Sequence, residues 1–327
     1  MFYSFPVPFV DEHVASIIYR AFQCTNYKSI EQYYKKELNA LFFDMPQRFW
    51  ISSYSEVALA LNNYFDLPQF LLRFTNLRDY TLLLDTEQSK TQSPLSLLEH
   101  LSTVKFAQAV NIKSDRAWRY CPECATEEDE SLGTSYWHKS HQGYYRLICD
   151  RHQCLLKSFE GKFGLPPVEQ SSSEVTTKQV ATEKRLRWIV EQIRLTPSKL
   201  RKNCLIQAFK QKLNISDAEH LKLQNRDRLR YLHHWFADCY NKTGLGDFFE
   251  WGAMGANLYP LDSIRGLYFM LDCKNNIHPM IYLMLCYVLL TDDEIVMALE
   301  IPNEGAENNF MATRMLMPFE IPNAKYA

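Results

Sequence analysis

The chain has 327 residues, of which 46% are hydrophobic and 23% charged, so it can build buried cores in two or three domains. Its formal net charge of -2 excludes indiscriminate nucleic-acid binding by the whole surface, although local patches stay open. The longest apolar run, Ile277–Leu290, contains His278 and Pro279 and is too short to cross a bilayer. No secretion signal follows Met1, so we expect a cytoplasmic protein without a membrane partner.

Residues 1–112 are predicted to form an N-terminal helical domain. The segment Pro6-Val7-Pro8 should be extended, because each proline restricts the residue before it. Asp11 is then expected to cap a helix that ends at Cys24. A second helix is expected over Ser29–Leu38, and a further one over Leu95–Leu101.

Two short helices are predicted over Ser55–Phe65 and Pro68–Phe74, with a tight connection between them. Such a pair is compatible with a helix-turn-helix, which would bind DNA. The alternative is an ordinary packed helical hairpin, since no glycine marks the turn and only Arg73 and Arg78 supply positive charge there.

Residues 113–163 contain two pairs of metal-ligand residues with the same internal spacing. Two residues separate Cys121 from Cys124, and two separate Cys149 from His152. Zinc prefers four thiolate or imidazole donors in a tetrahedron, which paired knuckles of this kind supply. Because four protein ligands leave no position for water, the spacing predicts one structural zinc ion per chain in a small zinc-finger module. Cys154 is an alternative ligand, but we expect it to pack rather than coordinate.

The remaining cysteines lie in apolar stretches and are expected to be small buried hydrophobic residues: Cys24, Cys204, Cys239, Cys273 and Cys286. Strand signals are confined to the zinc module, around Tyr144–Ile148. The fold class predicted for the whole chain is therefore mainly α.

The ligand pairs are embedded in a longer motif, and this motif resembles the TniQ/TnsD family of transposon target-selection proteins. The family pattern is an arginine, Cys-Pro-x-Cys, an acidic stretch, a glycine, Tyr-Trp, His-Gln, and Cys-x-x-His followed by leucine. Here it is matched by Arg119, Cys121-Pro122-Glu123-Cys124, Glu127–Glu130, Gly133, Tyr136-Trp137, His141-Gln142, Cys149, His152 and Leu156.

The family opening is also similar to residues near the start of the chain: Pro6-Val7-Pro8, Asp11-Glu12 and Arg20. The clear match covers residues 5–24 and 116–156. Two positions depart from the family pattern, since Asp150 stands where proline is frequent and Gln153 where glycine is frequent. The resemblance implies that Arg119, Tyr136, Trp137, His141 and Gln142 support the zinc module.

The resemblance further implies a bacterial adaptor in DNA transposition. Such a protein links a target mark, either a guide-RNA Cascade complex or target DNA, to the AAA+ ATPase TnsC, and it would meet the nucleoid during transposition. A homodimer is compatible with this role. The rivals are an autonomous sequence-specific DNA-binding protein of the TnsD type and a zinc-dependent hydrolase. We predict no enzyme activity, because the sequence has no phosphate-binding loop or nucleophile motif, and His138 and His141 are expected to support the zinc module.

A linker over 164–173, with two prolines and three serines, is expected to precede a C-terminal helical domain over 174–327. The helices expected in this domain are Ala181–Ile193, Leu200–Leu213, Asp227–Tyr240 and Met280–Leu290. Ten lysines and arginines but only two glutamates lie between Lys178 and Lys212, which indicates a phosphate-binding surface. Its candidate contacts are Arg185, Arg187, Arg194, Arg201 and Lys202. The alternative is a solvated helical face, and the acidic residues after Thr291 are expected to form a solvated tail or a protein-contact surface.

Overall fold

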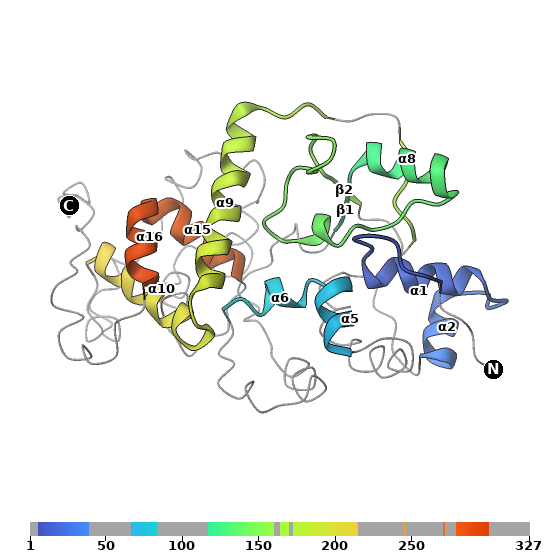
Figure 1. Ribbon diagram of the computed structural model, residues 1–327, viewed down its shortest axis with the longest axis horizontal. Coiled ribbons are helices and arrows are strands. Elements are labelled where there is room, and N and C mark those ends of the chain that lie inside the picture. Colours follow the sequence, from blue (N-terminus) through green and yellow to red (C-terminus); the bar gives the residue numbers. More distant parts are fainter. Residues whose placement is uncertain are drawn as a thin grey trace, which may run out of the picture. The chain divides into compact units, whose positions relative to one another are not determined.

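The computed structural model describes residues 6–38, 67–83, 117–159, 164–169, 173–214, 245, 271 and 279–300 (Figure 1). The chain divides into two compact units. Unit 1 comprises Met1–Thr81, Gln88–Lys105 and Ile112–Lys184, and unit 2 comprises Leu82–Glu87, Phe106–Asn111 and Arg185–Ala327. The fold is mainly helical, as the sequence predicts. The boundaries proposed at residues 112, 163 and 173 remain predictions.

Unit 1 begins with two amphipathic helices, α1 (Val14–Gln23) and α2 (Ile30–Glu37). Ser29 caps α2, because its side chain accepts a hydrogen bond from the amide of Gln32. The prediction that Asp11 caps α1 is wrong. His13 is the cap and accepts from the amide of Ala15 at 3.2 Å, while Asp11 adopts a left-handed backbone with φ of 61°.

Two more helices of unit 1 are α5 (Leu67–Phe74) and the single turn α6 (Leu77–Tyr80). Asn76, between them, donates from its amide group to the carbonyl of Lys139 at 3.1 Å. The other predicted member of the helix-turn-helix, Ser55–Phe65, lies outside the described residues, as does Leu95–Leu101. The helix-turn-helix therefore stays a prediction.

The rest of unit 1 is a small module built on a two-stranded antiparallel ribbon. Strand β1 (Trp118–Tyr120) pairs with β2 (Lys157–Phe159), with Arg119 opposite Ser158. Between them lie helix α8 (Pro122–Leu132) and the 3-10 turn η2 (Ser140–Gln142). Proline occupies the first turn of α8 and Gly133 ends it at φ of 71°, which is the usual placement of these residues.

The strand expected at Tyr144–Ile148 is not present, since only Ile148 forms an isolated bridge, to Leu155. The backbone groups here find other partners. The amide of Leu147 donates to the Glu183 carboxylate at 3.0 Å, and its carbonyl accepts from Leu156. The Glu183 carboxylate thus satisfies the backbone N–H of Leu147, which in a β-strand would donate to the carbonyl of a neighbouring strand.

Unit 2 contains most of α9 (Thr177–Leu195), together with α10 (Ser198–Lys212), α15 (Pro279–Leu289) and α16 (Asp292–Leu299). Every residue of Met280–Cys286 is fully buried, which makes α15 the central helix of the described part of unit 2. Leu186, Ile189 and Phe209, from α9 and α10, are likewise fully buried. The predicted helix Asp227–Tyr240 lies outside the described residues.

The acidic segment after Thr291 is not a solvated tail as far as Leu299. It forms α16, which Thr291 and Glu294 begin with a reciprocal capping box. Glu294 also forms an ion pair with Lys212 of α10 at 2.6 Å. Within the described ranges, no helix combines the length and hydrophobicity needed to cross a bilayer.

Candidate metal centre

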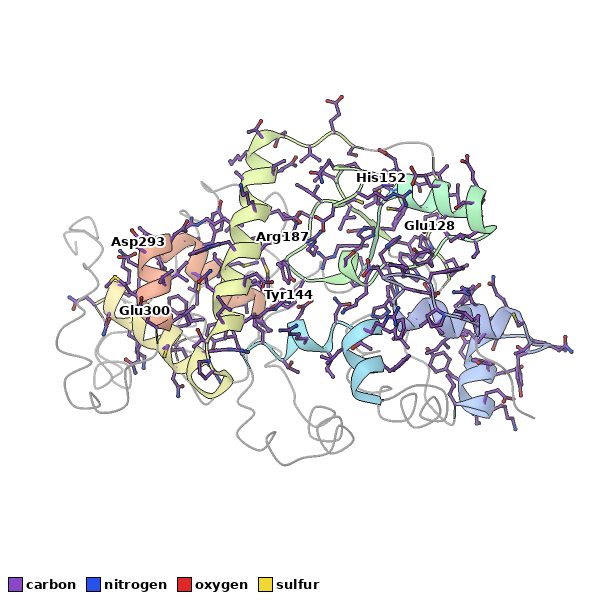
Figure 2. The ribbon with its side chains drawn as sticks, viewed as in Figure 1. Glu128, Tyr144, His152, Arg187, Asp293 and Glu300 are labelled. Carbon is purple, nitrogen blue, oxygen red and sulfur yellow. The ribbon has the colours of Figure 1, made fainter. Side chains whose placement is uncertain are left out.

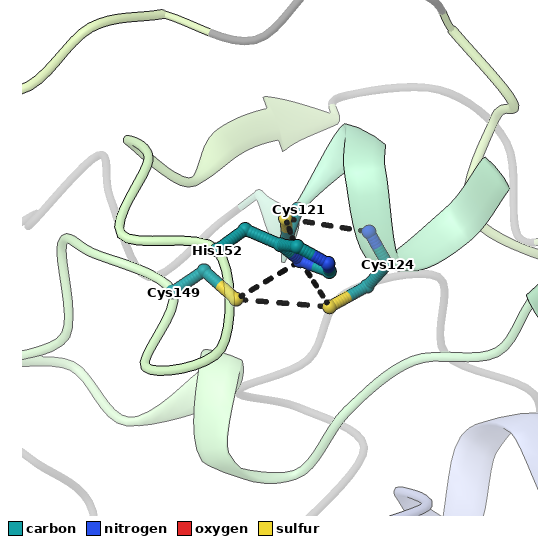
Figure 3. Close-up of side chains that lie close together, drawn as sticks. All are labelled: Cys121, Cys124, Cys149 and His152. Atoms are coloured by element: carbon teal, nitrogen blue, oxygen red, sulfur yellow. Dashed lines mark hydrogen bonds between the residues drawn. The ribbon is translucent and has the colours of Figure 1, made fainter. Parts of the chain in front are cut away.

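Cys121, Cys124, Cys149 and His152 converge in unit 1, although the two pairs lie 24 residues apart in sequence (Figure 3). Cys121 immediately precedes α8 and Cys124 lies in its first turn, while the other pair belongs to the turn after Ile148. The three sulfurs and one imidazole nitrogen all lie within 4.8 Å of one another. The three cysteines are buried, so this cluster could hold a metal ion away from bulk water.

The distances between the donor atoms fit a tetrahedral zinc site. Zinc–sulfur bonds of about 2.3 Å and zinc–nitrogen bonds of about 2.0 Å place two sulfurs about 3.7 Å apart and a sulfur about 3.5 Å from the nitrogen. The sulfurs of Cys124 and Cys149 are 3.6 Å apart. Nδ1 of His152 lies 3.3 Å from the sulfur of Cys121 and of Cys124, and 3.8 Å from that of Cys149.

Charge in the cluster also suits a cation. Hydrogen bonds from Cys124 and Cys149 lower the pKa of the Cys121 thiol to about 2, so a thiolate forms there readily. Burial lowers the pKa of His152, but its hydrogen bonds to Glu127 and the cysteine sulfurs outweigh burial and raise it to about 9. A bound metal ion would displace that proton from Nδ1.

Glu127 contacts one of the four candidate ligands, although in the sequence it stands out only as part of an acidic stretch. Its Oε1 lies 3.1 Å from Nε2 of His152, and its Oε2 pairs with Arg151 at 2.5 Å. A carboxylate on the far nitrogen of a metal-binding histidine fixes the tautomer and the ring orientation. The sequence does contain an indication of this contact, because Glu127 belongs to the acidic stretch that accompanies the ligand pairs in the family motif.

A second set of contacts fastens the zinc module to the opening segment of the chain. The amide of His13 donates to the carbonyl of Trp137 at 2.7 Å, and the amide of Lys139 donates to the carbonyl of Asp11 at 2.7 Å. The Ser16 hydroxyl accepts from the Trp137 amide at 2.6 Å. These contacts, which we call the clasp, join residues 11–16 to residues 137–140.

His138 provides the charged part of the clasp. Its Nε2 lies 2.5 Å from Glu128, which is labelled on α8 in Figure 2, and its Nδ1 lies 3.3 Å from Asp11. Burial lowers the pKa of His138, but the bonds to these two carboxylates outweigh it and raise the pKa to about 9. A protonated His138 therefore bridges two carboxylates from separate elements, and Asp11 has a lowered pKa because His138 and Ser140 offset its burial.

Other residues of the motif hold the module from within. The side chain of Gln142 accepts from the Arg119 amide at 3.0 Å and donates to the Arg119 carbonyl at 2.7 Å. The fully buried Trp137 donates from its indole to the carbonyl of Gly164 at 2.7 Å and packs against Trp118 with ring centroids 5.1 Å apart. Tyr136 donates to the carbonyl of Val10 at 3.1 Å.

His141 is buried and lies against His138, with ring centroids 4.5 Å apart. Burial lowers its pKa, against a hydrogen bond to the Cys149 thiol that raises it. A neutral His141 thus contacts one of the four candidate ligands.

The remaining described cysteines differ in their surroundings. The sulfur of Cys154 lies 3.3 Å from that of Cys121 but outside the group of four donors. Cys286 is buried as expected, and Cys204 is partly buried. The prediction for Cys24 is wrong, because it is the residue that follows α1 and is exposed. Cys239 and Cys273 lie outside the described residues.

Three of the basic candidates of unit 2, Arg185, Arg194 and Arg201, have partners within the unit. Arg185 donates to the carbonyls of Tyr287 and Leu290, and Arg201 donates to those of Thr196, Arg194 and Leu82. Arg194 pairs with Glu191, Lys202 is buried, and Arg187, labelled in Figure 2, is exposed. Their contact with nucleic acid stays a prediction.

Residues 3–156 match the TniQ family, a span that contains the opening segment, the clasp and all four candidate ligands. Over these residues the chain is similar to the TniQ family. No curated protein sequence matches the chain. The TniQ match marks a transposition-associated protein and agrees with the resemblance deduced from the motif residues.

Proposed function

We propose that this TniQ-family chain is a target-selection adaptor of a bacterial DNA transposon. It would link a target complex, either a guide-RNA Cascade complex or target DNA, to the AAA+ regulator TnsC. Its action would be binding and scaffolding rather than catalysis. Support comes from the TniQ match over residues 3–156 and from the four donors of the cluster, which would fill a tetrahedral metal site and leave no position for a catalytic water.

We also propose that the cluster holds one structural zinc ion. The donor spacing fits zinc, and the binding free energy of the ion would stabilise a module whose ribbon has only three residues in each strand. Metal analysis of the purified chain should find one zinc ion, and Cys121→Ser should lose it. A metal-free chain with unchanged stability would overturn this assignment.

The observation that carries the adaptor proposal is the clasp. The two segments most similar to the family, the opening and the zinc module, form one body through contacts between residues more than 120 positions apart. Scaffolding requires such a rigid platform, because ordering a flexible surface when a partner binds costs conformational entropy and weakens the binding.

The opening segment, residues 6–13, presents a candidate surface for contact with a protein partner. Arg20 forms an ion pair with the buried Glu12 at 2.6 Å and lies over the ring of Phe9 at 3.9 Å, which holds the segment in place. The side chains of Val7 and Val10 nevertheless remain 83% and 81% exposed. Rigid, exposed apolar side chains are the kind that a protein partner covers. We propose that Val7 and Val10 form part of the surface that binds TnsC.

The test is association with purified TnsC, measured alone and on target DNA or Cascade. The double variant Val7→Ser/Val10→Ser should lose association with TnsC while retaining its zinc. The matched control is Val168→Ser/Val180→Ser, because these valines of unit 1 are also exposed, at 49% and 43%. If the wild-type chain does not associate with TnsC, and guided insertion proceeds without the chain, the adaptor proposal is wrong.

Binding of the chain alone to duplex DNA, measured over a range of salt concentrations, tests the alternative of an autonomous DNA-binding protein. That alternative requires tight, salt-dependent binding of duplex DNA with no partner present. The described basic residues offer limited support for it, since Arg185 and Arg201 already bond to backbone carbonyls. A zinc-dependent hydrolase would need an open metal position, which four protein donors do not leave.

A further inference from the structure

Cys154 is a buried thiol beside the metal cluster to which the zinc site assigns no role. Its sulfur lies 3.3 Å from the sulfur of Cys121, closer than the 3.6 Å between Cys124 and Cys149. The two residues are 33 positions apart in sequence, so the tertiary fold creates this proximity.

The backbone holds Cys154 at this position. The amide of Cys149 donates to the carbonyl of Cys154 at 2.9 Å, and the amide of Gln153 donates to the carbonyl of Cys149 at 2.9 Å. Gln153 adopts a left-handed conformation with φ of 52°, which turns the chain back after His152. The bridge between Ile148 and Leu155 closes the same turn. Cys154 is thereby fixed next to Cys121 although it lies outside the four-donor group.

We propose that Cys154 is the resolving thiol of a reversible oxidation of the metal centre, and that a peroxide converts Cys121 and Cys154 into a disulfide that excludes zinc. The sulfur of Cys121 attacks one oxygen of hydrogen peroxide, which breaks the O–O bond and gives a sulfenic acid and water. The thiol of Cys154 then attacks the Cys121 sulfur and displaces the second oxygen as water. Two thiols and one peroxide give one disulfide and two waters.

The geometry makes this step accessible. A disulfide bond measures about 2.05 Å, so the two sulfurs need to approach each other by only about 1.2 Å from their present separation. Once bonded, Cys121 can no longer act as a thiolate ligand, so only three of the four donors remain and the closed tetrahedral site that would retain zinc is lost. A disulfide is reversed by thiols, whereas further oxidation of a sulfenic acid to a sulfinic acid is not. Cys154 would therefore protect the centre from permanent damage.

Tryptic peptides distinguish the possible pairs. Cleavage after Arg119, Lys139, Arg146, Arg151 and Lys157 gives three relevant peptides. Peptide 120–139 contains Cys121 and Cys124, peptide 147–151 contains Cys149, and peptide 152–157 contains Cys154. The full-length zinc-loaded chain is treated with hydrogen peroxide, its free thiols are alkylated, and the peptides are compared by mass spectrometry with and without reductant. A chromophoric chelator records zinc release in parallel.

We expect zinc release to coincide with a linked species of peptides 120–139 and 152–157, with fragmentation placing the bond on Cys121. Dithiothreitol and added zinc should then restore the metal. Cys154→Ser should bind zinc before oxidation, give no linked species, and recover several-fold less zinc afterwards because Cys121 reaches sulfinic acid. Cys204→Ser, at a partly buried thiol of α10, is the control and should behave as the wild type.

Three results would overturn the proposal. The first is a dominant bond within peptide 120–139, or between it and peptide 147–151. The second is full zinc recovery by Cys154→Ser after oxidation. The third is a loss of zinc in both Cys154→Ser and Cys154→Ala before any oxidant is added, which would make Cys154 a ligand. Zinc content and the identity of the linked peptides are measured without TnsC, so these outcomes are independent of the adaptor function.

Discussion

Glu127 offers the sharpest test of the candidate metal centre, because it is not one of the four donors and contacts them through His152. In Glu127→Ala the Nε2 hydrogen of His152 loses its carboxylate partner at 3.1 Å, and the Arg151 ion pair is also removed. The ring is then free to rotate and to carry its proton on Nδ1, the nitrogen that faces the sulfurs. The expected result is a lower affinity for zinc with an unchanged stoichiometry of one.

The size of the loss follows from exposure. Loss of a carboxylate that supports a metal-binding histidine weakens metal binding by about 10–100-fold. The side chain of Glu127 is 45% exposed, so water partly replaces it, and we expect the lower end of that range. The change is then about 10-fold, or about 1.4 kcal/mol.

The difference should also grow with pH. In the metal-free chain Glu127 helps to raise the pKa of His152 to about 9, so zinc must displace a proton at neutral pH. Without Glu127 the pKa of His152 is lower, so zinc displaces less of a proton at neutral pH and the loss of zinc affinity is partly offset. Above pH 9 His152 is deprotonated in both proteins, so this offset disappears and the full loss of affinity is measured.

Competition with a chromophoric chelator across this pH range measures both effects. Glu130→Ala, at an exposed position of the same helix, is the matched control. Equal zinc affinity of Glu127→Ala, Glu130→Ala and the wild type at high pH would refute the role assigned to Glu127.

Four further predictions concern stability, and denaturant unfolding of the zinc-loaded chain measures each of them. Trp137→Ala removes a fully buried indole and should lower the free energy of unfolding by about 3–5 kcal/mol, and a loss below that of an exposed Leu132→Ala control would contradict its place in the core. His138 has a folded pKa of about 9 against its usual 6.5, so its contribution is complete below pH 6.5 and fades as the pH rises through 9. The stability difference between the wild type and His138→Gln should shrink by roughly 3 kcal/mol over that range, and a constant difference would disprove the charged bridge. Gly143→Ala places a methyl group 2.8 Å from Cγ of Arg146 and should cost about 1–3 kcal/mol, whereas no loss would show that the loop relaxes freely. Arg185→Gln leaves the carbonyls of Tyr287 and Leu290 without their guanidinium and should cost about 1.5–3 kcal/mol, whereas Lys184→Gln, at an exposed position of the same helix, should leave stability unchanged.

Features set by neighbouring residues were predictable from the sequence. The gathering of the four donors followed from two identical spacings, and Ser29 capped the helix that it preceded. Helix α16 carried the equally local signal of a threonine followed three residues later by glutamate. The negative charge of the segment predicts solvent exposure, whereas its capping residues predict the helix that the structure contains.

Features that depend on distant partners could not be deduced in this way. Asp11 looks like a helix cap, but its carboxylate is engaged with His138 and Ser140, which lie 127 and 129 positions later. The basic stretch looks like a phosphate-binding surface, yet Arg185 and Lys212 pair with Asp292 and Glu294 in the acidic segment. The sequence shows the basic stretch and the acidic segment about 80 or more positions apart, and only the tertiary fold shows that they form ion pairs with each other.

The clasp has a consequence for how the protein is made in the cell. Residues 13 and 16 find their partners in Trp137, so helix α1 cannot complete its packing until the ribosome has synthesised about 120 further residues. At roughly 5–20 residues per second this delay lasts about 6–24 seconds, during which the apolar face of α1 is without its final cover. His152, the last zinc donor, emerges later still. Newly made chains that stall before this point should therefore be the ones that aggregate or recruit chaperones, whatever zinc is available.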